Sequence, residues 1–194
     1  MPLNSGYLPK MRRKTKRTNP YDDMAIVKAT YTKSRSGAKA AIRYIEHRPG
    51  KEGEKVKREL YGIDGSMERG EAYQMIDAAE KRTVFFRIVI SPDPQTEDTE
   101  KDLRLAEITA QTMLHLADRL TKDVPYVAVE HDDHAPHRHV HILALVNGRL
   151  NTQDFQALRE TATEAALSQR QERDLAREQQ QQQEGGQWAG QAAS

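Results

Sequence analysis

Apolar residues gather in blocks along the chain, and four of these blocks have the composition of β-strands. The strongest is 83–90 (TVFFRIVI), which is nearly continuous in apolar and β-forming residues and is stopped by Ser91-Pro-Asp-Pro94. A short histidine-rich segment joins the last two blocks, so we expect them to pair as antiparallel neighbours. The four predicted strands are 24–32 (MAIVKATYT), 83–90, 125–130 (PYVAVE) and 138–146 (RHVHILALV).

Four other segments have the pattern of helices. In 99–120 the apolar residues recur at helical spacing along one face. In 66–79, Ser66 is a suitable N-cap, and Glu68 and Glu71 follow in the first turn. Between elements, 61–65 (YGIDG) is typical of a turn. The four predicted helices are 37–47, 66–79, 99–120 and 151–178.

The two ends of the chain differ in composition from its middle. Residues 1–20 contain six Lys or Arg and no acidic residue, and we interpret them as a disordered basic arm. Residues 179–194 begin with five glutamines and predict a disordered tail or linker. We therefore place one domain in residues 21–178. Its predicted class is mixed α/β (α+β), with a central, mostly antiparallel sheet, helices packed on one face and the candidate site over the other.

The net charge of +1 conceals a strong asymmetry. Residues 1–59 contain 16 Lys or Arg against 6 Asp or Glu, whereas the remaining 135 residues contain 14 against 23. A basic first third predicts a polyanionic partner such as nucleic acid, because Lys and Arg make most phosphate contacts. The absence of cysteine excludes disulfides, thiolate metal sites and a cysteine nucleophile. No apolar run approaches the roughly 20 residues of a membrane helix, so we expect no membrane insertion and a cytoplasmic location.

Five of the seven histidines lie within eleven residues, at positions 131, 134, 137, 139 and 141. On a strand, alternate side chains share a face, so neighbouring imidazoles of this segment can hold one ion. A ligand set of His139 and His141 with His131 from the preceding strand leaves coordination positions open, as a catalytic metal requires. His137 is a further candidate ligand. Asp133 is a candidate acceptor that orients a ligating ring, although it also suits an ordinary turn.

Three stretches carry a resemblance to a known family. They are His131-Asp-Asp133, the run 137–145 (HRHVHILAL) and the preceding strand 86–92 (FRIVISP). The chain resembles the relaxases of conjugative and mobilisable plasmids, within the HUH endonucleases. It is most similar to the branch that includes the T-DNA border endonuclease and broad-host-range plasmid nicking enzymes. The resemblance spans about residues 24–150. The stretch after His131 is one residue longer than in the family, so the ligand pair can be aligned in two ways. A Pro-His-x-His match selects His137 and His139, whereas the apolar strand that follows favours His139 and His141.

The resemblance implies a relaxase-like fold and a site- and strand-specific nick at a transfer origin, for conjugative transfer. The implied cofactor is a divalent ion, Mg²⁺ or Mn²⁺, and three imidazoles also accept Zn²⁺, Ni²⁺ or Cu²⁺. The implied partners are single-stranded or melted DNA, accessory relaxosome proteins and a coupling protein.

Relaxases of this branch use a tyrosine near the N-terminus, in a helix after the first strand. Tyr44 matches that placement, and Tyr31 is the alternative. A phenolate that attacks a phosphodiester forms a 5′-phosphotyrosyl link and conserves the bond for rejoining. Basic residues near Tyr44 would then contact phosphates; the candidates are Arg35, Lys39, Arg43 and Arg48.

Two other functions are compatible with the same residues. A rolling-circle replication initiator uses the same nicking chemistry at a replication origin. A DNA-binding accessory protein with a metal-stabilised hairpin would have no nuclease activity. The sequence leaves open the nicking site, the host element, the physiological metal, the oligomeric state and whether the chain is part of a longer relaxase.

Overall fold

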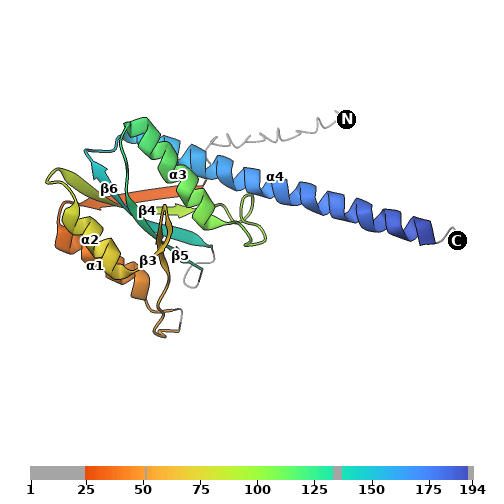
Figure 1. Cartoon of the computed structure of the whole chain (residues 1–194), viewed down its shortest axis with the longest axis horizontal. Coiled ribbons are helices and arrows are strands. Elements are labelled where there is room, and N and C mark those ends of the chain that lie inside the picture. The colour runs from red at the N-terminus through yellow and green to blue at the C-terminus, as the bar shows by residue number, and fades with distance from the viewer. Residues whose placement is uncertain (1–24, 51, 133–136, 192–194) are drawn as a thin grey trace, which may run out of the picture.

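In the part of the chain that the structure describes, six strands form one antiparallel sheet, in the order β1-β4-β6-β5-β2-β3. The computed structural model describes residues 25–50, 52–132 and 137–191, with residues 184–191 as backbone alone (Figure 1). The predicted basic arm, residues 1–20, lies outside this range. The strands are β1 (Ile26–Thr32), β2 (Leu60–Gly62), β3 (Gly65–Met67), β4 (Thr83–Ser91), β5 (Tyr126–His131) and β6 (His139–Asn147).

The described residues also form four helices: α1 (Arg35–His47), α2 (Arg69–Ala78), α3 (Leu105–Leu120) and α4 (Thr152–Gln191). The predicted mixed α/β class and the antiparallel sheet are confirmed. The helices cover both faces of the sheet, however, whereas we expected them on one. α3 and α4 pack on one face, where the buried residues include Ile88, Ile142 and Leu158. α1 and α2 pack on the other, around Ile42 and Leu143.

The central strands explain why both faces are covered. β4 and β6 are each apolar at six of nine positions, and these positions fall on both faces, so each face of the sheet presents apolar side chains that must be removed from water. On β6, for example, Ile142 points into one core and Leu143 into the other. We call these the α3/α4 face and the α1/α2 face. Among the described residues, no helix combines the length and the apolar character needed to cross a bilayer.

Some element boundaries differ from the sequence prediction. α2 begins at Arg69 with Glu68 as its N-cap, because Glu68 and Glu71 form a reciprocal capping box. Ser66, the predicted cap, lies instead in the β2–β3 hairpin, whose turn falls at the predicted position. α3 begins at Leu105 and not near residue 99. The segment before it forms turns, and Lys101 there has the left-handed φ of 58°.

The last helix is long and leaves the body of the domain. α4 continues to Gln191, beyond residue 178 where the sequence predicted its end, and Figure 1 shows it projecting away from the sheet. Before it projects, it is tied to the loop that precedes α3. Arg173 forms an ion pair with Asp102 at 2.7 Å, and Arg177 pairs with Glu100.

The same loop is anchored to the start of β6 by Arg138. The guanidinium lies 3.4 Å from the Asp98 carboxylate and donates to the Leu103 carbonyl at 3.0 Å. The hydroxyl of Ser91 in turn donates to the Arg138 carbonyl. Arg138 therefore fixes the backbone of the strand that carries two of the candidate metal ligands.

Candidate metal centre and tyrosine cleft

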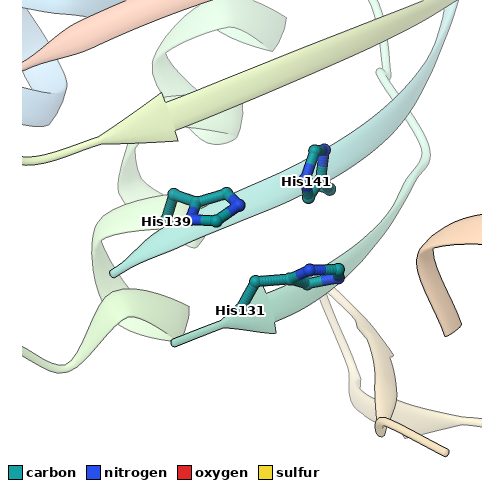
Figure 2. Close-up of side chains that lie close together, drawn as sticks. All are labelled: His131, His139 and His141. Carbon is teal, nitrogen blue, oxygen red and sulfur yellow. The ribbon is translucent and has the colours of Figure 1, made fainter. Parts of the chain in front are cut away.

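Three of the predicted ligands meet on the α1/α2 face. His131, the last residue of β5, is the Cα partner of His139 in β6, and His141 lies two residues further along β6. The ring centroids are 4.7 to 5.4 Å apart, and one nitrogen from each ring lies within 4.8 Å of the others. Figure 2 shows the three imidazoles turned toward one another from two adjacent strands. This cluster can hold a metal ion.

Two of the rings are oriented by backbone carbonyls. His131 Nε2 lies 2.9 Å from the Ile45 carbonyl, and His139 Nδ1 lies 3.2 Å from the His137 carbonyl. A carbonyl only accepts, so each of these nitrogens carries the proton. In a neutral imidazole the lone pair is then on the other nitrogen, Nδ1 of His131 and Nε2 of His139. Fixing the tautomer in this way is the usual role of groups behind a metal ligand.

The third ring, His141, is held in its neutral form. Its pKa is lowered to about 3, chiefly by burial and also by the neighbouring His131 and His139 and the cations Arg48 and Arg58. Its Nε2 is buried and has no hydrogen-bond partner among the described residues. A buried lone pair without a donor is costly unless something else occupies it. A metal cation fits this position, and the all-imidazole donor set suits divalent ions.

The carbonyl that orients His131 is available because of a proline. In an α-helix the carbonyl of Ile45 would accept from the N–H four residues later, but that residue is Pro49, which has no N–H. Arg48, the residue before it, has the extended backbone (ψ 127°) that proline imposes, so α1 ends at His47. The end of α1 thus presents a carbonyl to the metal centre.

Replacing Pro49 by alanine is therefore expected to weaken metal binding. Alanine supplies an N–H that competes for the Ile45 carbonyl and allows α1 to extend. We expect the affinity for Mn²⁺ or Zn²⁺ to fall about tenfold, as for other groups that support a ligating histidine. Isothermal titration gives the affinity, and ¹⁵N NMR of the metal-free protein reports the His131 tautomer. An unchanged tautomer with unchanged affinity would contradict this assignment.

A cleft of about 560 Å³ adjoins the histidines on the same face. It lies between α1 and strands β1, β4 and β6, and Tyr44 and His141 both line it. Tyr44 is 57% exposed, so its hydroxyl is accessible to a large substrate. Lys28 and Arg87 also line the cleft and are exposed. The cleft therefore combines a tyrosine, a candidate metal ligand and two cations.

Tyr31, the alternative nucleophile, lies on the other side of the sheet. It is paired in register with Phe86, and the two ring centroids are 5.8 Å apart. Phe86 belongs to the core of the α3/α4 face. Tyr31 therefore points away from the three histidines.

The other described tyrosines are also outside the cleft. Tyr61 and Tyr126 pack with the α3/α4 core, and burial raises the pKa of both. Tyr73 lies on α2, where its hydroxyl donates to the Lys39 carbonyl. Among the described residues, Tyr44 is the one tyrosine that lines the cleft beside His141. Tyr7 and Tyr21 lie outside the described residues.

Two of the four predicted phosphate contacts serve the packing of α1 on α2. The Arg35 guanidinium donates to the carbonyls of Ile76 and Ala79, which caps the end of α2. Lys39 forms a 2.7 Å ion pair with Asp77. Both side chains are thus held at the interface between the two helices, away from the histidines.

The other two predicted cations differ in position. Arg48 is close enough to His141 to lower its pKa, whereas Arg43 is exposed on α1 and is not among the described residues that line the cleft. Sequence reasoning missed Lys28, Arg58 and Arg87. Strand register is the signal that could have found Lys28, because Lys28, Val89 and His141 form one row across β1, β4 and β6.

Of the remaining predicted site residues, His137 lies at the entrance to β6. It is outside the group of three, and it contributes its carbonyl to His139. Its own Nδ1 is buried without a hydrogen-bond partner in the described part of the chain. Asp133, the predicted acceptor that orients a ligating ring, lies outside the described residues.

Comparison of the chain with protein-family models, with curated proteins and with solved structures gave no match. Function must therefore be inferred from the residues themselves. Three structural features bear on the function: the group of three imidazoles, two of which are oriented by carbonyls; the accessible hydroxyl of Tyr44 in the adjoining cleft; and the cations around both. What the molecule displays is a candidate metal centre next to a candidate nucleophile.

Proposed function

We propose that the protein is a metal-dependent DNA nicking-and-joining enzyme of the relaxase type, acting on a transfer origin. The observation that carries the proposal is the shared cleft of Tyr44 and His141. An accessible tyrosine beside a three-histidine cluster offers two groups that metal-assisted phosphodiester transesterification can use, a nucleophile and a site for a divalent cation.

In the proposed reaction, the Tyr44 oxygen attacks a phosphorus atom of the DNA backbone. A new phosphorus–oxygen bond to tyrosine forms, the bond to the 3′ oxygen breaks, and that oxygen leaves as a hydroxyl after gaining a proton. The phenolic proton is lost to solvent. The exchange of one ester for another conserves the bond energy, so the 3′ hydroxyl can later reverse the step.

The chain's own groups have distinct tasks in this scheme. His131, His139 and His141 would hold a divalent ion, which would withdraw charge from the phosphate. Lys28 and Arg87, which line the cleft, would hold the flanking phosphates. We propose Mg²⁺ or Mn²⁺ as the working ion. Zn²⁺, Ni²⁺ or Cu²⁺ would bind the same imidazoles in isolated protein.

The substrate in this proposal is single-stranded or melted DNA, because a cleft of about 560 Å³ between α1 and the sheet is too small to hold a segment of duplex. Accessory relaxosome proteins and a coupling protein would act with the enzyme in transfer. A replication initiator would share the cleft chemistry and differ in the origin that it cuts.

The direct test is the formation of a covalent adduct. The protein is incubated with Mn²⁺ and labelled single-stranded oligonucleotides that tile both strands of the DNA flanking its gene. We expect an adduct that survives denaturation and is lost when a chelator replaces the metal. Tryptic digestion separates the candidates, because Tyr31 falls in the peptide 29–33 and Tyr44 in the peptide 44–51.

Each outcome of that digestion has a definite meaning. A nucleotide attached to the peptide 44–51 supports the proposal. Attachment to the peptide 29–33 would overturn the assignment of Tyr44. The absence of any adduct, from a protein that binds both metal and DNA, would favour a non-catalytic DNA-binding accessory protein.

A further inference from the structure

A second cavity lies on the opposite face of the sheet, against the edge strand β1. Its volume is about 330 Å³, near the roughly 300 Å³ at which small-ligand pockets begin. Tyr31, Phe86 and Phe155 line it, together with the cations Lys33 and Arg149. Nothing in the proposed nicking reaction uses these residues.

The three aromatic rings contact one another in a row that ends at the exposed Tyr31 ring, which we call the Tyr31 platform. The Phe86 ring contacts Phe155 edge-on at a centroid distance of 6.4 Å and Tyr31 at 5.8 Å with a tilt of 46°. Phe86 is buried, whereas Tyr31 is 64% exposed. One side of the Tyr31 ring is thus supported by the core, and the other is presented to solvent. A rigidly held aromatic face of this kind is what a flat ligand stacks on.

The charges around the platform select an anion. Lys33 and Arg149 line the cavity, and no carboxylate does. Within the described part of the chain, neither cation forms an ion pair. Their charges are therefore available to a ligand, unlike those of Arg35 and Lys39.

The position of the cavity connects it with the tyrosine cleft. Ala29 and Thr30 of β1 line both the cavity and the cleft. β1 is an edge strand, with β4 on its one paired side. In the described part of the chain, the cleft and the cavity therefore meet along this edge strand, and one DNA strand that follows β1 would contact both.

We propose that the Tyr31 cavity binds an unpaired base of the single-stranded DNA that occupies the tyrosine cleft. The base stacks on Tyr31, and Lys33 and Arg149 contact the phosphates on either side of it. Aromatic stacking with flanking cations is the usual mode of single-strand binding without sequence preference. An acidic peptide would satisfy the cations, but it has no flat ring for the platform. The identity of the ligand as DNA rests on the proposed function; the stacking role of Tyr31 is independent of Tyr44.

Binding of a labelled single-stranded oligo(dT), measured by fluorescence anisotropy in the presence of a chelator, tests the role of the ring. We expect Tyr31→Ala to weaken binding about tenfold, which is the effect of losing one stacked base. Tyr31→Phe keeps the ring and should bind as wild type does. Binding by Tyr31→Ala equal to wild type would overturn the proposal, as would no binding by wild type or an equal loss in Tyr31→Phe.

Two further measurements locate the contact. In the double variant Lys33→Ala, Arg149→Ala, the slope of log affinity against log salt should become shallower by about 1.4, or 0.7 per phosphate on a single strand. In Tyr31→Trp with Trp188→Phe, the introduced tryptophan should be quenched by oligo(dT). An unchanged salt slope, or quenching by an acidic peptide and not by oligo(dT), would contradict the proposal.

The proposal that Tyr44 nicks DNA and the proposal that Tyr31 stacks on a base can each be contradicted without affecting the other. Loss of affinity in Tyr31→Ala without any covalent adduct in wild type would leave a DNA-binding platform on a protein that does not nick. An adduct at Tyr44 with unimpaired DNA binding by Tyr31→Ala would leave the nickase and remove the platform.

Discussion

Replacing Tyr44 by phenylalanine is expected to abolish the covalent DNA adduct while leaving metal and DNA binding intact. The substitution removes one oxygen atom from a ring that is 57% exposed, so the fold should be unaffected. Loss of a covalent nucleophile costs on the order of 10⁶ in rate in well-studied hydrolases, and here we expect adduct formation to fall by more than about 10³. Denaturing gel analysis of labelled oligonucleotide, with Mn²⁺ present, measures the change.

The chain supplies matched controls for this experiment. Tyr73→Phe removes a hydroxyl that bonds α2 to α1, outside the cleft, and should retain adduct formation. Tyr31→Phe removes a hydroxyl on the opposite face and should retain it as well. If Tyr44→Phe still forms the adduct, the nucleophile lies elsewhere. Tyr7 and Tyr21 would then be the next residues to replace.

The second large effect is expected from His141→Ala. The wild-type protein should be stabilised by Mn²⁺ or Zn²⁺, by about 2.7 kcal/mol when the ion is at 100 times its Kd. For a chain of this size, that corresponds to a rise in Tm of roughly 5 to 10 °C. His141→Ala removes one of three ligands, and we expect the affinity to fall more than about a hundredfold and the thermal shift to disappear.

His137→Ala is the matched control for the ligand assignment. It also removes an imidazole from the start of β6, but the carbonyl that orients His139 belongs to the backbone and remains. We therefore expect the metal-induced shift to survive in this variant. The Tm of each metal-free variant shows whether the domain still folds. An equal loss of the metal effect in both variants would mean that His137 is a ligand.

The sequence predicted the site well where the relevant information is local. Alternation along a strand is sufficient to place His139 and His141 on one face, and the hairpin brings His131 opposite His139. The helical position of Tyr44 was likewise predicted, because 37–47 contains helix formers without a breaker. These inferences required only periodicity and a pairing of neighbouring strands.

What the sequence did not predict depends on contacts between distant segments. Arg35 and Lys39 carry the same charge as Arg43, and their engagement by α2 becomes visible only when the two helices are packed together. The bond from His131 to the Ile45 carbonyl spans 86 positions. Apolar residues on both faces of β4 and β6 are a signal for helices on both faces, but the partner of each face depends on the tertiary fold.

Arg138 gives the metal centre a mechanical support on the far side of the sheet. Arg138 lies between His137 and His139 in sequence. Its side chain nevertheless extends to the opposite face, where it binds the Asp98 carboxylate and the Leu103 carbonyl in the loop before α3. The same loop forms ion pairs with Arg173 and Arg177 of α4. A continuous series of contacts therefore connects the candidate metal centre, through Arg138 and the loop before α3, with the projecting helix α4. A force on the projecting part of α4, from a bound protein or a DNA strand under tension, would act on the loop before α3. Through Arg138 it would displace the candidate metal ligands without involving the cleft.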